Sequence, residues 1–203
     1  MERKNLDFGT TIKEAFSFGI KNAPSIMAAF LLWLITIWIP YINIGTTIAM
    51  SMLPLEVANG RVINPLDIFD SKWRRYMGEF FMTFILMILP MLIAFLFLYI
   101  PGIVLSMAWS LSFYFLIDKG KNPVQAIKAS NDATYGSKWT IFFTTLVIGL
   151  LLGIIGGAFY AIGLMADSLP ILIAVMVVFV LIAAPIGIAA DASIWRQLRD
   201  NVE

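Results

Sequence analysis

The 203-residue sequence contains neither cysteine nor histidine. The lack of cysteine excludes disulfide bonds and thiolate metal sites. The lack of histidine excludes Ser-His hydrolases, His-Glu-x-x-His metalloproteases and histidine-based phosphatases, because each needs an imidazole as base or ligand. The acidic residues at the edges of the apolar runs, Asp118, Asp167 and Asp191, are far apart in sequence and form no recognisable catalytic pair. The sequence therefore predicts a protein that is not an enzyme and holds no cofactor and no metal.

Charged residues are also scarce, at 13% of the chain, whereas hydrophobic residues make up 60%. An ordinary soluble domain has about 25% charged and 45–50% apolar residues. A soluble domain of this size leaves too much surface in water to hide so many apolar side chains. The net charge of +1 gives no basic surface for nucleic acid. Lipid is the solvent that this composition suits, and the sequence predicts an all-α membrane protein.

Six apolar runs approach the length of about 20 residues that crosses a bilayer as a helix. They cover residues 24–39, 41–57, 80–99, 102–117, 140–165 and 169–195. Three short, almost uncharged turns separate them in pairs. We therefore expect one membrane domain over residues 1–203, with six transmembrane helices arranged as three helical hairpins.

The basic residues lie outside the short turns. Residues 1–23, 58–79 and 118–138 hold four lysines or arginines each, and the tail from Arg196 holds two, which together are all 14. Short loops rich in lysine and arginine stay on the cytoplasmic side of a membrane. The sequence thus predicts a multi-pass protein of the cell membrane with both termini in the cytoplasm, and an even number of spans agrees with this.

The charged segments resemble one another. Asn64-Pro65 recurs 58 residues later as Asn122-Pro123, and Gly78 recurs at the same offset as Gly136. Each segment is followed by a span, a tight turn and a second span. We interpret this pattern as three internal repeats over residues 8–58, 64–118 and 122–195.

The charged segments also have helical periodicity. An apolar stripe in the second segment comprises Leu66, Phe69, Trp73, Tyr76, Met77 and Phe80, and one in the first comprises Phe8, Ile12, Phe16 and Ile20. Such segments are typical of amphipathic helices that lie in the cytoplasmic membrane interface. Their residues that would bind lipid or a partner are Trp73, Arg74, Arg75 and Lys121. Binding of anionic lipid and simple anchoring both fit this pattern.

A family resemblance is carried by Pro101-Gly102, by Asp118-x-Gly120-x-x-Pro123-x-x-Ala126-Ile127-x-x-Ser130, and by Gly136. Residues 99–155 resemble a broad group of uncharacterised prokaryotic six-helix integral membrane proteins, which includes the membrane domain attached to some glycerophosphodiester phosphodiesterases. The resemblance implies a six-helix membrane module. It transfers no catalytic residue, because the catalytic domain of those enzymes is a separate barrel.

Two further features bear on function. Asp191 is a carboxylate inside the last apolar run, which makes it a candidate residue for transport, although pairing with a neighbouring cation is an equally physical interpretation. Gly149, Gly153 and Gly157 recur every four residues, as in close helix packing.

The sequence favours a non-enzymatic scaffold or lipid-interacting module. Its partners would be membrane lipids and a membrane or cytoplasmic protein. The alternative is a small transporter or channel with a path between the helical repeats. The oligomeric state does not follow from the sequence.

Overall fold

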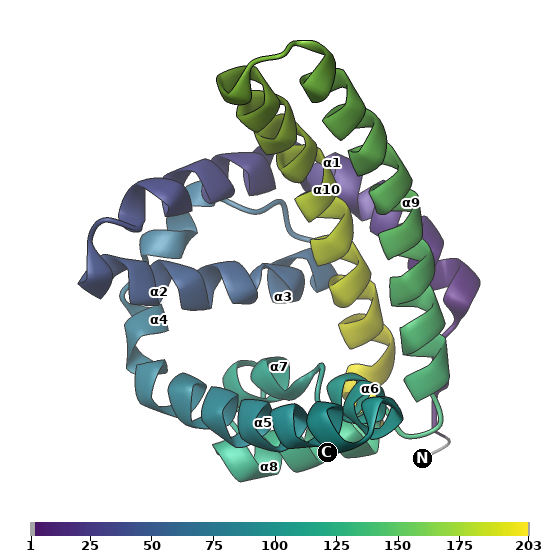
Figure 1. Ribbon diagram of the computed structural model, residues 1–203. Helices are drawn as coiled ribbons and strands as arrows, with labels where there is room; N and C mark the ends of the chain where they lie inside the picture. Colours follow the sequence, from purple (N-terminus) through teal and green to yellow (C-terminus); the bar gives the residue numbers. More distant parts are fainter. Residues whose placement is uncertain (1–2, 203) are drawn as a thin grey trace.

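The computed structural model describes residues 3–202, which fold into helices without a β-strand (Figure 1). Residues 1, 2 and 203, which belong to the predicted N-terminal segment and tail, lie outside the described residues. The helices are α1 (Phe8–Thr36), α2 (Pro40–Ser51), α3 (Leu53–Ala58), η1 (Pro65–Phe69), α4 (Lys72–Arg75), α5 (Met77–Phe97), α6 (Tyr99–Ala108), α7 (Ser112–Ile117), α8 (Pro123–Ala133), α9 (Lys138–Met165), α10 (Leu169–Leu198) and η2 (Arg199–Asn201).

Within residues 3–202, five segments are long and apolar enough to cross a membrane. They are Phe8–Thr36, Met77–Phe97, Tyr99–Ile117, Lys138–Met165 and Leu169–Asn201. These five helices are compatible with the multi-pass membrane protein expected from composition. The predicted second span, residues 41–57, is not among the five, and it is divided at Met52 into the 12-residue α2 and the 6-residue α3.

The first amphipathic stripe and the first apolar run form one continuous helix, α1, with Pro24 inside it. Its buried face is not the predicted stripe. Phe8 and Ile20 are 41% and 69% exposed, whereas the small residues Ala15 and Gly19 are buried. These small side chains allow another helix to pack closely against this side of α1.

That neighbour is α10, which crosses α1 at Gly19. A Cβ atom added at Gly19 would lie 3.0 Å from the Ile186 Cα and 3.1 Å from the Pro185 carbonyl oxygen. A larger residue here would push the two backbones apart by a few tenths of an ångström, so glycine favours this close approach. Ala15, Ile148, Ile186 and Ala190 form a small apolar cluster around the crossing. The first and last helices of the chain are thus packed directly on each other.

The two ends of the chain are joined by hydrogen bonds. The Lys4 backbone N–H donates to the Asn201 side chain at 2.9 Å, and the Asp7 N–H donates to the Gln197 side chain at 2.9 Å. The Leu6 N–H donates to Ser137 Oγ at 3.0 Å, just before α9 begins. The first and last described residues therefore lie at one end of the molecule, away from the turn that joins α9 to α10 (Figure 1).

The apolar run of residues 102–117 is broken between α6 and α7, and α8 seals the break. Ser130 of α8, which is fully buried, donates to the Ala108 carbonyl at 2.8 Å and accepts from the Leu111 N–H at 3.0 Å. Thr134 also donates to the Ala108 carbonyl, at 3.3 Å. These bonds satisfy backbone groups that a helix break leaves without partners.

The same contacts explain the Asn-Pro motif. Asn122 and Gln125 form a capping box at the start of α8, and Pro123 occupies its first turn. Ala126 is fully buried one turn before Ser130. Gly136, with a φ of 86°, turns the chain from α8 into α9. The motif therefore encodes a short helix whose buried side holds two helix ends together.

Related caps open all three predicted repeats. The side chains of Asp7, Asn64 and Asn122 accept hydrogen bonds from backbone N–H groups at the starts of α1, η1 and α8. The breaks at Met52 and around Ser110 are also 58 residues apart in sequence. However, α10 has no corresponding break, and Gly78 lies inside α5 whereas Gly136 makes a turn. The repeats remain a prediction.

The segment between α3 and α5 folds back along α2. The Arg74 guanidinium lies 5.5 Å from the centre of the Tyr41 ring, and a Cβ added at Gly45 would lie 2.9 Å from Arg74 Cγ. The predicted stripe of residues 66–80 is not one helix but is divided into η1, α4 and the start of α5. Arg74 thus contacts the start of α2, on the turn that the sequence assigns to the opposite membrane face.

We predict that Ser130→Ala lowers the free energy of unfolding by about 1–3 kcal/mol, because it removes the partner of two buried backbone groups. The bond from Thr134 to Ala108 places the expected value in the lower half of that range. The measurement is unfolding by sodium dodecyl sulfate in mixed micelles, followed by helical circular dichroism. Ser110→Ala is the control, because the exposed Ser110 hydroxyl only donates to Met107 in its own turn. Equal shifts for both variants would contradict a special role for Ser130.

Candidate functional site

The residues predicted to bind lipid or a partner separate into different environments. Trp73 is 7% exposed and belongs to the main apolar core. Its indole N–H donates to the Asp67 carbonyl at 2.9 Å. Trp73 therefore anchors α4 to the protein instead of pointing outward into lipid.

The two arginines beside Trp73 also differ. Arg74 is half-buried over Tyr41, whereas the Arg75 side chain is exposed and has no hydrogen bond or ion pair with residues 3–202. Lys121 lies in the connection between α7 and α8, where its backbone N–H donates to the Phe115 carbonyl at 3.3 Å. The structure thus brings Trp73, Arg74 and Arg75 together on α4 and places Lys121 on another connection.

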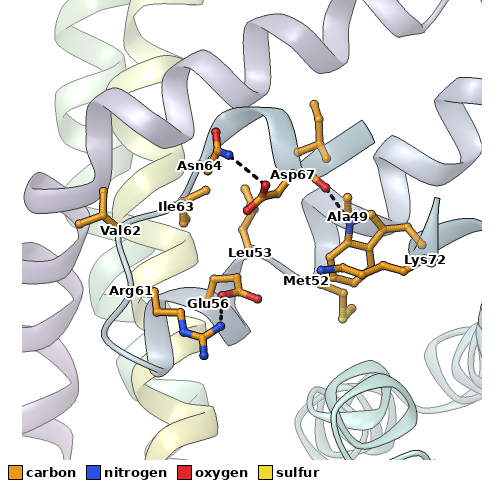
Figure 2. A pocket seen from close by; sticks show the side chains of 12 residues that line it. Ala49, Met52, Leu53, Glu56, Arg61, Val62, Ile63, Asn64, Asp67 and Lys72 are labelled. Carbon is orange, nitrogen blue, oxygen red and sulfur yellow. Dashed lines mark hydrogen bonds and ion pairs between the residues drawn. The ribbon is translucent and has the colours of Figure 1, made fainter. Parts of the chain in front are cut away.

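A polar pocket of about 160 Å³ lies where the 59–64 loop, η1 and α4 meet α2 and α3 (Figure 2). Its ionisable and amide side chains are Glu56, Arg61, Asn64, Asp67 and Lys72. Apolar residues form the remaining wall: Ala49, Met52, Leu53, Val62, Ile63, Ile68 and Trp73. The pocket therefore has both signs of charge over an apolar floor.

The charges of the pocket are loosely paired. Arg61 lies 3.8 Å from Glu56, and Asn64 donates to the Asp67 carboxylate at 3.0 Å (Figure 2). The Arg61 side chain is 74% exposed, and a pair of this kind contributes at most about 1 kcal/mol. The guanidinium can exchange Glu56 for another anion at little cost.

Lys72 stands at the edge of the same pocket. Its ammonium lies 4.7 Å from the centre of the Trp73 ring and 3.5 Å from Asp70. The Lys72 backbone N–H donates to the Asp70 carboxylate at 2.9 Å, and this hydrogen bond lowers the pKa of Asp70 below its usual value. Asp70 is therefore ionised at neutral pH and holds the first turn of α4.

Among residues 3–202, no three acidic side chains come together as metal ligands. What the pocket offers is two cations and two carboxylates within one small volume. The two cations, Arg61 and Lys72, are side chains that pair with phosphate groups, including those of lipid headgroups.

Sequence reasoning missed most of this pocket. Asp67 looked like a solvated residue on a surface helix, and Glu56 lay at the end of a predicted span. The signal in the sequence was the presence of both acids and bases between residues 56 and 72. What was not visible is that this stretch folds back on α3.

A second polar cluster joins α1 to α10. Glu14, whose side chain is 15% exposed, forms an ion pair with Arg196 and accepts a hydrogen bond from Ser193 Oγ at 2.6 Å. The Gln197 amide donates to Thr11 at 3.0 Å. This cluster uses its charges internally and therefore serves the packing of the two helices.

The same cluster leaves Asp191 without Arg196 as an ion-pair partner. Arg196, the nearest cation in sequence, pairs with Glu14 and not with Asp191. The Asp191 side chain is exposed on α10, and no hydrogen bond or ion pair joins it to any residue in the described part of the chain. Its turn of α10 packs through Trp195 against Phe115 and Tyr114, with ring centres 4.9 Å and 5.6 Å apart.

No protein family model, curated protein or solved structure matches this chain. The resemblance of residues 99–155 to the membrane domain of glycerophosphodiester phosphodiesterases therefore remains a prediction.

Proposed function

We propose that this protein is a non-enzymatic multi-pass protein of the cell membrane that binds anionic lipid at its cytoplasmic face. A scaffold role toward a membrane or cytoplasmic protein is compatible with the same surface. The proposal has two parts, the orientation of the chain and the chemistry of residues 61–75.

For the orientation, we propose six crossings with both termini in the cytoplasm. The hydrogen bonds between residues 4–7 and 197–201 support an even number of crossings. Residues 40–58 give a helical length of about 28 Å, close to the roughly 30 Å of a bilayer core. The contact between Arg74 and Tyr41 argues against a crossing by α2 and α3, because it places a residue that follows α3 beside the start of α2. Whether α2 and α3 cross therefore decides the number of membrane crossings.

The chain has no cysteine, so single-cysteine variants report orientation without background. We predict that Lys72→Cys and Lys128→Cys are shielded from a membrane-impermeant maleimide in intact cells and react in inverted vesicles. Trp38→Cys, at a position that is 88% exposed, should react in intact cells. Labelling of Lys72→Cys and Lys128→Cys from opposite sides would refute the orientation. Labelling of Trp38→Cys from the same side as Lys72→Cys would show that α2 and α3 do not cross.

For the chemistry, the observation that carries the proposal is that three exposed apolar side chains lie between exposed cationic side chains along one short segment. Val62, Leu66 and Phe69 are 64%, 62% and 39% exposed, and Arg61 and Arg75 are exposed beside them. Apolar side chains that enter the headgroup region, flanked by cations, are the mark of an interfacial lipid-binding segment. Buried Trp73 fixes this segment to the protein.

The lipid headgroup would lie at the polar pocket. Its phosphate would replace Glu56 as the partner of Arg61 and approach Lys72. Each basic residue near an anionic membrane surface adds about 1 kcal/mol of attraction. Arg74 is the wrong residue for a test, because its side chain packs on Tyr41 and Gly45 and its loss would disturb the fold.

We predict that Arg61→Gln with Arg75→Gln weakens binding of phosphatidylglycerol by roughly thirty-fold, since two charges of about 1 kcal/mol each are removed. Binding of phosphatidylcholine should change little. The measurement is native mass spectrometry of the full-length protein in detergent, with each lipid titrated separately. Lys119→Gln with Lys128→Gln is the matched control, because both lysines are exposed and neither lines the pocket. Equal loss in both double variants would reduce the effect to net charge and contradict a site at residues 61–75.

A second function, passage of an ion or small solute, is favoured by one specific observation. Asp191 is an unpaired carboxylate inside an apolar helix, and two other apolar segments are interrupted at Met52 and around Ser110. Unpaired charges and broken helices are features of transport paths.

We predict that Asp191→Asn folds with unchanged stability, because the carboxylate has no partner to lose. Under the lipid-binding proposal, neither the wild-type protein nor this variant moves ions in liposomes, as measured with a pH- or potassium-sensitive dye. A wild-type flux that Asp191→Asn abolishes would replace lipid binding with transport as the function.

A further inference from the structure

A long apolar groove separates α6 from α9. One hollow of about 180 Å³ and another of about 330 Å³ share Met107 and Phe142, so that they form one continuous groove. Its α6 side is made by Ile103, Val104 and Met107, and its α9 side by Trp139, Phe142, Thr145, Leu146, Gly149 and Leu150. Neither hollow has an acidic residue in its wall.

The groove has the length of one membrane leaflet. It extends along α9 from Lys138 to Leu150, which is about 18 Å at 1.5 Å per residue. Half of a bilayer core is about 15 Å. A single extended hydrocarbon chain that starts at the interface would follow the groove to near the middle of the membrane.

Gly149 of α9 keeps the groove open. Gly149 lines it, and a Cβ added at Gly149 or at Gly153 would meet no atom within 4 Å. These glycines therefore do not pack against another helix of this chain, contrary to the interpretation that their spacing suggested. α9 presents a smooth surface there instead.

The mouth of the groove is cationic and aromatic. Lys138 and Tyr135 line it, and Trp139 beside them is 58% exposed. The Arg3 guanidinium lies 5.1 Å from the centre of the Tyr135 ring. The Lys138 ammonium donates to the Asn131 side chain at 2.9 Å, and two of its three N–H donors remain for a ligand. Exposed tryptophan and tyrosine, as at the mouth of this groove, are typical of the membrane interface.

We infer that this groove binds one phospholipid with an anionic headgroup, whose phosphate lies at Lys138 and Tyr135 and whose acyl chain lies between α6 and α9. The cationic mouth selects the charge of the lipid, and the groove length selects a chain that reaches the middle of the bilayer. This site goes beyond the proposed function, because it shares no residue with the pocket beside residues 61–75.

The experiment uses the full-length protein in detergent and native mass spectrometry with phosphatidylglycerol or phosphatidylcholine. We expect Lys138→Gln to weaken phosphatidylglycerol binding about fivefold, the effect of one surface charge, and to leave phosphatidylcholine binding unchanged. Glutamine keeps a donor for Asn131. Lys128→Gln, at an exposed lysine that lines neither hollow, is the matched control and should have no effect.

A second variant tests the groove itself. Gly149→Leu places a side chain in the groove, because Gly149 lines it and a Cβ atom there meets no neighbour within 4 Å. We expect this variant to lose one tightly bound lipid of either kind, whereas Gly157→Leu, which also faces open space but lines neither hollow, retains it. Phosphatidylglycerol with a photoreactive acyl chain should label peptides that contain Phe142 or Leu146 in the wild-type protein and not in Gly149→Leu.

Three results would overturn the inference. One is unchanged lipid number and labelling in Gly149→Leu, and another is equal weakening in Lys138→Gln and Lys128→Gln. The third is efficient disulfide cross-linking of Gly149→Cys between two copies in the membrane, because the groove would then hold a second copy of the chain. None of these results depends on Arg61 or Arg75, so that failure here and failure of the proposed function are distinguishable.

Discussion

The crossing of α1 and α10 is the constraint on which the rest of the structure depends. Gly19 lets the two backbones approach, and the pair of Glu14 and Arg196 fixes their rotation about each other. A charge pair that is half shielded from water costs desolvation, which the Ser193 hydroxyl offsets in part by donating to Glu14. The crossing joins helices at opposite ends of the sequence, and it therefore closes the chain into one body.

From this crossing, hydrogen bonds fix the remaining segments at the end where the termini meet. The first residues of the described chain bond to η2 and to the turn before α9, and Arg199 donates to Asn59 at the end of α3 at 3.2 Å. The connections after α3 and α8 and both chain ends are thus brought together. This end of the molecule collects polar backbone and side-chain groups, while α5, α9 and α10 present large apolar side chains outward. Polar groups at one end and apolar helices elsewhere are what a lipid environment stabilises.

Several apolar segments of the fold are interrupted helices. A break inside an apolar segment exposes backbone N–H and C=O groups that lipid cannot satisfy. The break after α6 is tolerated because Ser130 and Thr134 supply the missing partners from α8. In the same way, the short helices η1 and α4 are held by the Trp73 indole and the Asp70 carboxylate. Side-chain hydrogen bonds therefore stabilise these breaks and short helices in place of the backbone hydrogen bonds of a long helix.

The two lipid sites proposed for this chain would bind different parts of a lipid. The pocket beside α4 has charges of both signs and lies on a segment with exposed apolar side chains, so that headgroup chemistry dominates there. The groove between α6 and α9 is apolar over its length and cationic only at its mouth, so that the acyl chain dominates. Sequence periodicity suggested the first region through Trp73, Arg74 and Arg75. It gave no indication of the second, because Lys138 and Met107 become neighbours only after the chain has folded.

By itself, the sequence determined the solvent and the class of structure. The scarcity of charge and the long apolar runs favour lipid as the solvent, and a continuous apolar run of about 20 residues in lipid forms a helix. The caps at Asp7, Asn64 and Asn122 were local signals too, because a side chain that bonds to its own following turn needs no distant partner. Only the tertiary structure decided which faces are buried, that residues 41–57 divide into two short helices, that Trp73 points inward and that Asp191 has no cation beside it. These outcomes depend on contacts between residues far apart in the chain, such as Gly19 with Ile186, and helical periodicity cannot report which neighbour a face will meet.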